Sequence, residues 1–182
     1  RKSKPVKAEP KVNWFQEELD AFKPPERYTV SEWADNFRVL TNISAEPGRW
    51  RTNRTPYLKE PMDKFTDPLI EQIILCFGAQ IGKTEAELNM IGYALDQTQS
   101  PVMMVYPTDT IAKFASDKRV QPMIKSVKSI SDNFDENSKL LELDFNNGNY
   151  MVLVGANSPS SLSSRSIKYL FFDEIDKYPA FS

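Results

Sequence analysis

Runs of apolar residues typical of buried strands alternate with helical patterns along much of this chain. Three such runs, at residues 73–77, 101–106 and 167–172, have the length and composition of strands buried on both faces. Helical patterns follow the first two runs, at residues 83–95 and from residue 107 to about residue 124. Because strands alternating with helices form βαβ units, the pattern predicts an α/β fold, a three-layer sandwich with a mainly parallel central sheet.

A hairpin is predicted at residues 141–154. Two short apolar runs there flank an Asn-Asn-Gly-Asn sequence, which suits a tight turn. Upstream, Ser31 is a candidate cap for a helix that continues to about Leu40. We therefore expect one domain over residues 30–182, preceded by a basic, partly disordered segment over residues 1–29.

Composition narrows the possible chemistry. The chain has 182 residues, of which 40% are hydrophobic and 26% charged, as in water-soluble globular proteins. It has no histidine, which excludes a Ser-His-Asp triad and a histidine-bearing zinc site. Its single cysteine, Cys76, excludes an internal disulfide and is expected to be buried in the first strand. No apolar stretch approaches the roughly 20 residues of a membrane helix, so no membrane partner is expected.

Charge is unevenly distributed along the chain. The net charge is −2, which does not by itself indicate a nucleic-acid partner. The first twelve residues nevertheless carry five basic side chains and one acidic side chain. This tail is compatible with a solvated, disordered leader or with a contact to a phosphate backbone.

The junction between the first predicted strand and the first predicted helix carries the most specific pattern. Gly78 and Gly82 enclose a short loop, and Lys83 and Thr84 begin the helix. Glycines let backbone N–H groups surround phosphate oxygens, and a helix N-terminus adds partial positive charge. Lys83 can then reach the β- and γ-phosphates, and the Thr84 hydroxyl can ligate Mg²⁺. In the pattern G-x-x-x-x-G-K-[ST] the first glycine would fall at Phe77, so this loop departs from it by one position.

The third predicted strand ends in two carboxylates, Asp173 and Glu174. Ligands of α/β sheets bind at this edge, where Asp173 is the candidate Mg²⁺ ligand and Glu174 the candidate base for the attacking water. Taken singly, the Lys-Thr pair is compatible with an ordinary helix start, and the acidic pair with a solvated turn. Together and in this order they favour a nucleoside triphosphatase that uses ATP and Mg²⁺.

A loop rich in arginine and aromatic residues precedes this core, at residues 46–57. Trp50 or Tyr57 can stack on an adenine, with Arg51 or Arg54 nearby. The same aromatic residues can instead fix the loop to the core, and the pattern does not separate these two interpretations.

Six motifs can now be considered together, at residues 46–52, 54–57, 60–62, 80–85, 106–108 and 173–179. In combination they resemble the large terminase subunit of tailed phages, in its lambda-like family. The likeness runs from about residue 30 to the end of the chain. It implies an N-terminal ATPase domain with a P-loop fold of the RecA/ASCE type, which hydrolyses ATP to translocate double-stranded DNA into the procapsid. The implied partners are double-stranded DNA, the terminase small subunit and the capsid portal, and the implied location is the host cytoplasm.

The resemblance also implies roles for single residues. The expected ATP-binding residues are Tyr57, Gly78, Ala79, Gln80, Ile81, Gly82, Lys83, Thr84 and Glu85. The expected metal ligands are Thr84 and Asp173, and the expected catalytic residues are Lys83, Glu174 and Arg165.

The arginine of that set is open to two interpretations. Arg165 resembles a finger that acts on the neighbouring subunit of a homo-oligomeric ring, although a plain surface arginine is equally compatible. Gln80 stands near the position where related phosphate loops often carry an arginine. Arg119, on the helix after Thr108, is a weaker candidate and is more typical of a solvated face.

Two other functions remain open at this point. A superfamily-two helicase or translocase has similar motifs and would have a second RecA-like domain after this one. A nucleotide-gated clamp that binds DNA or a portal without turnover is the third interpretation. Nuclease activity is expected only in a C-terminal domain beyond residue 182, and the isolated chain is expected to be a weakly active monomer.

Overall fold

The computed structural model describes residues 28–41, 46–78, 80–158 and 165–179, together with residues 15 and 44. Most of the predicted N-terminal segment, Ala79 of the predicted phosphate loop and residues 159–164 lie outside the described residues. Within the described ranges, no helix is both long enough and apolar enough to cross a bilayer.

The described elements alternate as expected in the second half of the chain. The strands are β1 (Val39–Leu40), β2 (Gly48–Arg49), β3 (Val102–Tyr106), β4 (Glu142–Asp144), β5 (Tyr150–Gly155) and β6 (Tyr169–Phe172). The α-helices are α2 (Val30–Phe37), α3 (Lys59–Lys64), α4 (Lys83–Asp96), α5 (Asp109–Ala115), α6 (Gln121–Ser126) and α7 (Lys128–Ser131). The tighter or wider helical turns are η1 (Thr52–Arg54), η2 (Pro56–Leu58), the π-helical η3 (Ser116–Val120) and η5 (Ile175–Lys177).

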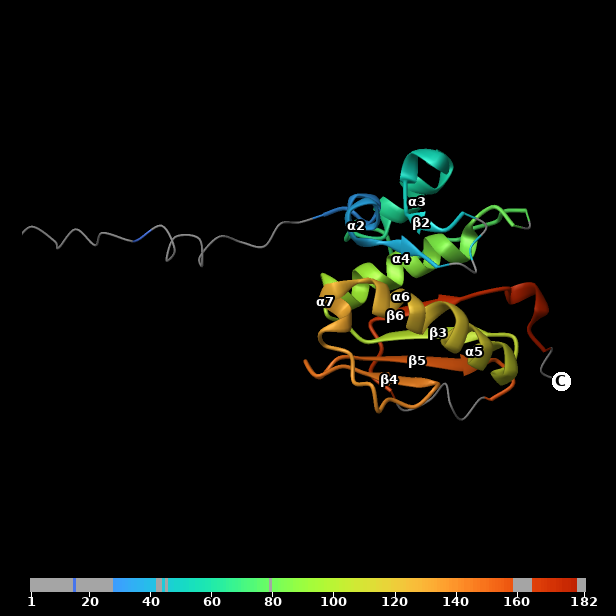
Figure 1. The fold of residues 1–182 in the computed structure, drawn as a ribbon. Helices are drawn as coiled ribbons and strands as arrows, with labels where there is room; N and C mark the ends of the chain where they lie inside the picture. Colours follow the sequence, from blue (N-terminus) through green and yellow to red (C-terminus); the bar gives the residue numbers. More distant parts are fainter. Residues whose placement is uncertain are drawn as a thin grey trace, which may run out of the picture.

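Four strands form one mostly parallel sheet in the order β4-β5-β3-β6 (Figure 1). The central strand β3 pairs in parallel with both β5 and β6, so that all three carboxyl ends lie at one edge. Strand β4 pairs antiparallel with β5 across the predicted hairpin turn. The prediction of an α/β fold with a mainly parallel sheet is therefore confirmed for the described residues.

The described helices pack on one face of this sheet. Alternate residues of β3 point to opposite faces, and Met104 and Tyr106 share a core cluster with buried residues of α2 to α7. Met103 and Val105 belong to a second cluster, which contains no residue of a described helix. Helices α2 and α3 lie on the side of α4 away from the strands (Figure 1). A third layer is thus not seen among the described residues, and the three-layer sandwich stays a prediction.

The predicted strand at residues 73–77 is wrong. Residues 71–78 pair with no strand in the part of the chain that the structure describes. Ile74 is 77% exposed, and Cys76 is exposed rather than buried. An apolar run shows that a segment can pair, but a strand also needs a neighbour whose N–H and C=O groups meet its own. The pattern contains no information about that neighbour.

The cap of the first described helix lies two residues before the predicted one. Thr29 caps α2: its hydroxyl accepts from the Glu32 N–H at 3.3 Å, and the Glu32 carboxylate accepts from the Thr29 N–H at 2.8 Å. Ser31 instead donates to the Asp63 carboxylate through its N–H (2.9 Å) and its hydroxyl (3.0 Å), which joins α2 to α3. The helix ends at Phe37, before the short strand β1.

Candidate functional site

The loop before α4 has a left-handed backbone at one of its two glycines, Gly82, and also at Gln80. Gln80 and Gly82 both have left-handed backbone conformations, with φ of 57° and 89°. A Cβ on Gly82 would also lie 3.2 Å from Leu58 Cδ1, so the position favours glycine on both grounds. Gly82 is the N-cap of α4, and no side chain caps this helix among the described residues. The first N–H groups of α4 are therefore suited to bind an anion.

Lys83 and Tyr57 both contact this loop. The Lys83 ammonium donates to the Phe77 carbonyl at 3.4 Å, a long contact that a stronger acceptor can replace. The Tyr57 hydroxyl donates to the Ile81 carbonyl at 3.0 Å, and its ring meets the edge of Phe77 with centroids 6.2 Å apart. With 49% of its surface exposed, Tyr57 retains an open face beside the loop.

Two other residues named from the sequence have structural partners. The Glu85 carboxylate forms an ion pair with Arg38, with Oε2 and Nη2 2.9 Å apart, and only 2% of the Arg38 side chain is exposed. Trp50 is buried, and its indole N–H donates to the Thr52 hydroxyl at 3.0 Å. The structure thus favours the core-fixing interpretation for Trp50, whereas Tyr57 lies beside the loop.

The acidic pair follows β6 at the carboxyl edge of the sheet. The Asp173 N–H donates to the Val105 carbonyl at 3.1 Å, which continues the pairing with β3 and holds the carboxylate in a buried position. Glu174 has a left-handed backbone (φ 53°) and an exposed side chain that pairs with Lys177 at 2.9 Å. Adjacent carboxylates therefore have different environments, one buried and one solvated.

The loop and the acidic pair lie close enough to influence each other. Burial raises the pKa of Asp173, and the neighbouring Glu174 charge raises it further. Lys83 is among the groups that lower the Asp173 pKa, so the lysine and the carboxylate share one electrostatic environment. Lys83 thus acts electrostatically on a residue that lies 90 positions away in the sequence (173 − 83).

Glu87 is a member of this site that was not singled out from the sequence. It lies one helical turn after Lys83, and its Oε2 atom is buried without a hydrogen-bond partner. Burial raises the pKa of Glu87 to about 8, the Asp173 charge adds to the rise, and Lys83 opposes it. The spacing of four residues from Lys83 was the available signal, because residues i and i+4 share a helix face.

Two tyrosines share the electrostatic environment of Asp173. Tyr106 is buried at the end of β3, and the Tyr178 hydroxyl donates to the Val105 carbonyl at 2.7 Å. Burial and the Asp173 charge raise the pKa of both phenols, so both stay neutral hydrogen-bonding groups at physiological pH.

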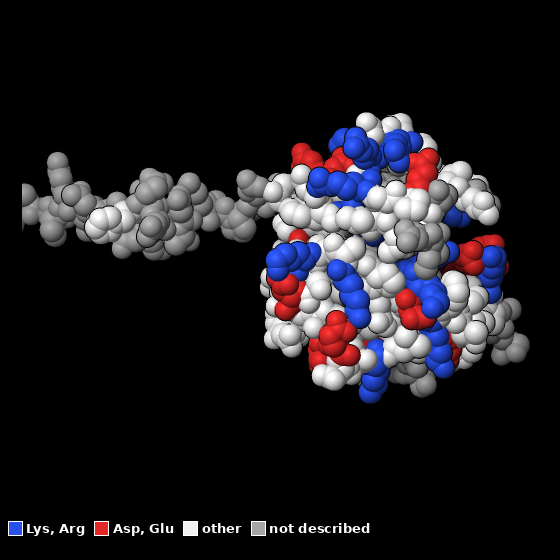
Figure 2. Space-filling view, viewed as in Figure 1, with Lys and Arg blue, Asp and Glu red and all other residues white. Residues whose placement is uncertain are grey.

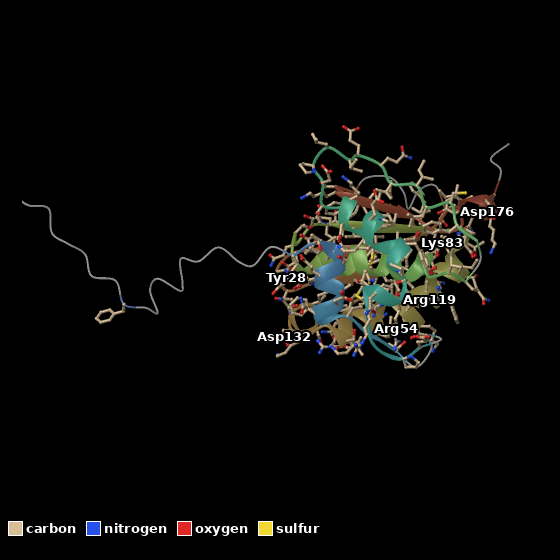
Figure 3. The ribbon with its side chains drawn as sticks, turned by 90° about the horizontal axis from the view of Figure 1, so that it is seen from above. Tyr28, Arg54, Lys83, Arg119, Asp132 and Asp176 are labelled. Carbon is tan, nitrogen blue, oxygen red and sulfur yellow. The ribbon has the colours of Figure 1, made fainter. Side chains whose placement is uncertain are left out.

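The two arginine candidates lie in different places. Arg165 forms an ion pair with Glu142 of β4, and together with Lys139, whose hydrogen bond has the larger effect, it lowers the Glu142 pKa to about 2. No interaction joins Arg165 to Lys83 or Asp173 among the described residues. Arg119, by contrast, influences the pKa of Asp173. Figure 3 shows Arg119 and Lys83 at the same end of the molecule, opposite Tyr28 and Asp132.

A divalent cation at this site would need further oxygen ligands from a bound phosphate or from water, in addition to those of the protein. No group of three or more acidic, histidine or cysteine side chains that could hold a metal occurs among the described residues. Asp173 is a buried carboxylate, and a buried anion is costly unless a cation compensates it. Mg²⁺ commonly binds through one or two protein oxygens plus phosphate oxygens and water. One or two protein oxygens would therefore be enough at this site, and Thr84 and Asp173 stay the predicted pair.

Comparison with known proteins identifies similar sequences. The family model described as "Phage terminase large subunit gpA, ATPase domain" matches residues 44–181. The chain is 23% identical over 162 residues to "Terminase, large subunit" of Enterobacteria phage P21, an alignment that covers 85% of this chain and 25% of that protein. The chain thus spans about a quarter of the length of the curated relative that it matches.

Among solved structures, the chain is similar to the Thermus phage P74-26 large terminase ATPase domain. The two share 19% sequence identity with a TM-score of 0.48, and the match covers 57% of this chain and 48% of that chain.

Proposed function

Since the chain belongs to the family of the phage terminase large subunit gpA ATPase domain, we propose that it hydrolyses ATP to translocate double-stranded DNA. The observation that carries the proposal is the juxtaposition of Lys83, at the start of α4, with the buried Asp173 at the end of β6. A phosphate-binding cation and a metal-binding carboxylate at one site are what triphosphate hydrolysis requires. The proposal includes a P-loop sandwich of the RecA/ASCE type.

Phosphate binding is assigned to the loop and the first turn of α4. The uncapped N–H groups of α4 bind the phosphate oxygens, aided by the partial positive charge of the helix. The Lys83 ammonium exchanges its long contact with the Phe77 carbonyl for the β- and γ-phosphates. Tyr57 holds the loop through Ile81 and offers its exposed face to the base of the nucleotide.

Metal binding is assigned to Thr84 and Asp173. Bound Mg²⁺ would neutralise charge on the phosphate oxygens in the transition state. Asp173 must be ionised for this role, and the nearby Lys83 charge favours the ionised form. The N–H of Asp173, bonded to Val105, fixes where the carboxylate lies relative to β3.

Water activation is assigned to Glu174. Its exposed carboxylate can accept a proton from the attacking water once the ion pair between Glu174 and Lys177 is broken. The Glu174 side chain is exposed and that of Asp173 is buried, so that the two carboxylates can act on different ligands.

Partners and location follow from the family and are part of the proposal. The face shown in Figure 2 carries basic and acidic side chains interspersed, so it offers no continuous basic stripe for DNA. Contacts with DNA would go to phosphates and be independent of sequence, as packaging requires. We assign the small subunit and the portal as partners, a homo-oligomeric ring as the working assembly, and the host cytoplasm as the location. The helicase alternative is not favoured, because the family match is to a terminase domain.

The test is nucleotide binding and phosphate release by three variants of the chain. Lys83→Ala should lower phosphate release by about 100-fold or more, since it removes a charged donor from the transition state. Glu174→Gln should bind ATP normally and release phosphate poorly. Lys113→Ala, which removes an exposed lysine from α5, is the matched control and should behave like the unmodified chain.

Each alternative predicts a different result. Near-normal turnover by Lys83→Ala would refute the site. Loss of ATP binding by Glu174→Gln would reassign that residue from water activation to nucleotide binding. Tight nucleotide binding by the unmodified chain, without phosphate release even with DNA and partners present, would favour the nucleotide-gated clamp.

A further inference from the structure

Arg38 and Asp173 are the two charged residues that are almost completely buried in the part of the chain that the structure describes. The Arg38 Nη2 atom donates to the Glu85 carboxylate at 2.9 Å, and its Nη1 atom donates to the Val39 carbonyl at 2.8 Å. The Nε atom of the same guanidinium is buried without a partner. Because a buried ion pair with an unsatisfied group adds little stability over apolar residues of similar size, the pair is better explained by the geometry that it fixes.

The partner of Arg38 lies in the first turn of α4. Glu85 follows directly after Lys83 and Thr84, and the uncapped N–H groups of this turn are the ones assigned to the phosphates. Gly82, at the N-cap, has no side chain with which to fix the direction of the turn. The ion pair between Glu85 and Arg38 therefore ties the phosphate-binding end of α4 to the end of α2.

The same end of α2 also holds the segment that carries Tyr57. The Arg38 carbonyl accepts from the Trp50 N–H at 3.0 Å, directly after β2. The Asp35 carboxylate, three residues earlier in α2, accepts from the Thr52 N–H at 2.6 Å. The chain then leads to Tyr57, whose hydroxyl donates to a carbonyl of the loop before α4. One end of α2 thus contacts both the helix assigned to the phosphates and the segment assigned to the base.

We propose that Arg38 is a positioning residue for nucleotide binding, which acts through Glu85 to fix the first turn of α4 relative to the segment that carries Tyr57. The inference rests on the proposed function, because it requires a nucleotide at the start of α4. It gives Glu85 a role other than the direct nucleotide contact that the sequence resemblance implies, since its carboxylate binds Arg38.

The experiment separates stability from nucleotide affinity. A non-hydrolysable ATP analogue with Mg²⁺ is titrated calorimetrically into the full 182-residue chain and its variants, at a temperature where circular dichroism shows each to be folded. Arg38→Met leaves Glu85 without its cation, so it should lower the melting temperature by roughly 5–15 °C. It should also weaken analogue binding by about 10-fold or more, as happens when a group that orients a ligand-binding residue is lost.

A double variant, Arg38→Met with Glu85→Leu, replaces the whole ion pair by apolar side chains. Because no buried charge is left without a partner, most of the lost melting temperature should return. The tie between α2 and the first turn of α4 is still absent, so analogue binding should stay weakened by about 10-fold or more. A purely structural ion pair predicts instead that stability and binding recover together.

Two further variants are the controls. Glu85→Gln keeps a side-chain oxygen that can accept from Arg38, so analogue binding should change by less than about threefold. Asp96→Ala removes the acceptor of the Trp33 indole N–H, at 2.7 Å, from the other end of α4. It loosens the same two helices away from the site, so it should lower the melting temperature and leave analogue binding unchanged.

Weakened binding that persists in the stable double variant is the deciding result. Normal binding by folded Arg38→Met, or recovery of binding in the double variant, would overturn the inference. A loss with Glu85→Gln as large as that of the double variant would make Glu85 a direct nucleotide contact and would also overturn it. If Arg38→Met is unfolded, the double variant decides on the same criterion, and a double variant that does not fold contradicts the inference. An unmodified chain that does not bind the analogue would refute the proposed function itself.

Discussion

Glu87 shows at the scale of one residue how burial changes the chemistry of a carboxyl group. Its Oε2 atom is buried without a partner, close to the charges of Asp173 and Lys83. Burial raises its pKa to about 8 from a usual value of 4.5, so the folded protein holds the proton more tightly than the unfolded chain does. Stability from this group is therefore present in full below about pH 4.5 and is lost as the pH rises toward about 8.

Replacement of Glu87 by glutamine should remove this pH dependence. The amide stays neutral, so Glu87→Gln should become progressively more stable than the unmodified chain between about pH 5 and about pH 9. The expected change is on the order of 1–4 kcal/mol in the free energy of unfolding. Urea unfolding of the nucleotide-free, metal-free protein at several pH values measures it. Glu60→Gln, at an exposed position of α3, should track the unmodified chain. A stability difference for Glu87→Gln that stays constant with pH would contradict the raised pKa.

At the scale of elements, the position of α4 depends on close contact with α2. Gly92 lies in the middle of α4, and a Cβ there would lie 2.3 Å from the Cη2 atom of Trp33. Trp33 is fully buried and its indole N–H donates to Asp96 at 2.7 Å, so the ring has little freedom to move. This contact fixes α4, which begins with Lys83, against α2.

Gly92→Ala tests that contact, because the expected loss of stability is opposite to the gain that helix propensity alone predicts. Alanine stabilises a helix interior by about 1 kcal/mol relative to glycine. The clash with Trp33 should instead destabilise the protein by roughly 1–3 kcal/mol. Denaturant unfolding gives the value, and Trp33→Phe in combination with Gly92→Ala should recover part of the loss, because the smaller ring leaves room. A gain in stability from Gly92→Ala alone would show that the helices are less closely packed.

At the scale of the whole molecule, Arg165 lies apart from the charged groups that influence Asp173 in the described part of the chain. Lys83, Glu87, Arg119 and Asp173 share an environment, whereas Arg165 pairs with Glu142 of β4. An arginine finger supplied in trans acts on a neighbouring subunit, so the separation of Arg165 from the site of its own chain does not argue against that role. The role of Arg165 therefore has to be tested in the proposed homo-oligomeric assembly.

Arg165→Ala should leave nucleotide binding by the isolated chain unchanged and reduce the assembly-dependent rate by about 10³-fold or more, as for other arginine fingers. Phosphate release with and without the assembled partners measures both quantities. Glu142→Gln removes the same ion pair and keeps Arg165, so it should retain the assembly-dependent rate. Equal effects of the two variants on that rate would mean that Arg165 serves only to hold β4.

Local patterns predicted most of the described core. The strands at β3 and β5, the hairpin turn and the start of α4 at Lys83 agree with expectation, because apolar periodicity, turn residues and glycines act over a few neighbouring positions. β6 is a strand as predicted, but it is not buried on both faces: it lies at the edge of the described sheet, with Leu170 and Phe172 exposed. The run at residues 73–77 failed as a strand because pairing needs a partner from elsewhere. The cap at Thr29 was missed in favour of Ser31, whose hydroxyl instead binds Asp63, 32 residues away.

The sequence by itself determined which chemical groups are present and which local conformations they favour, including the loop before Lys83, the acidic pair at residues 173–174 and the absence of histidine. Only the tertiary structure decided which of those groups meet. It buried Glu87 and turned Arg165 toward Glu142. The reason is physical: conformational preference acts between neighbours in the chain, whereas burial and electrostatic interaction depend on distance in space.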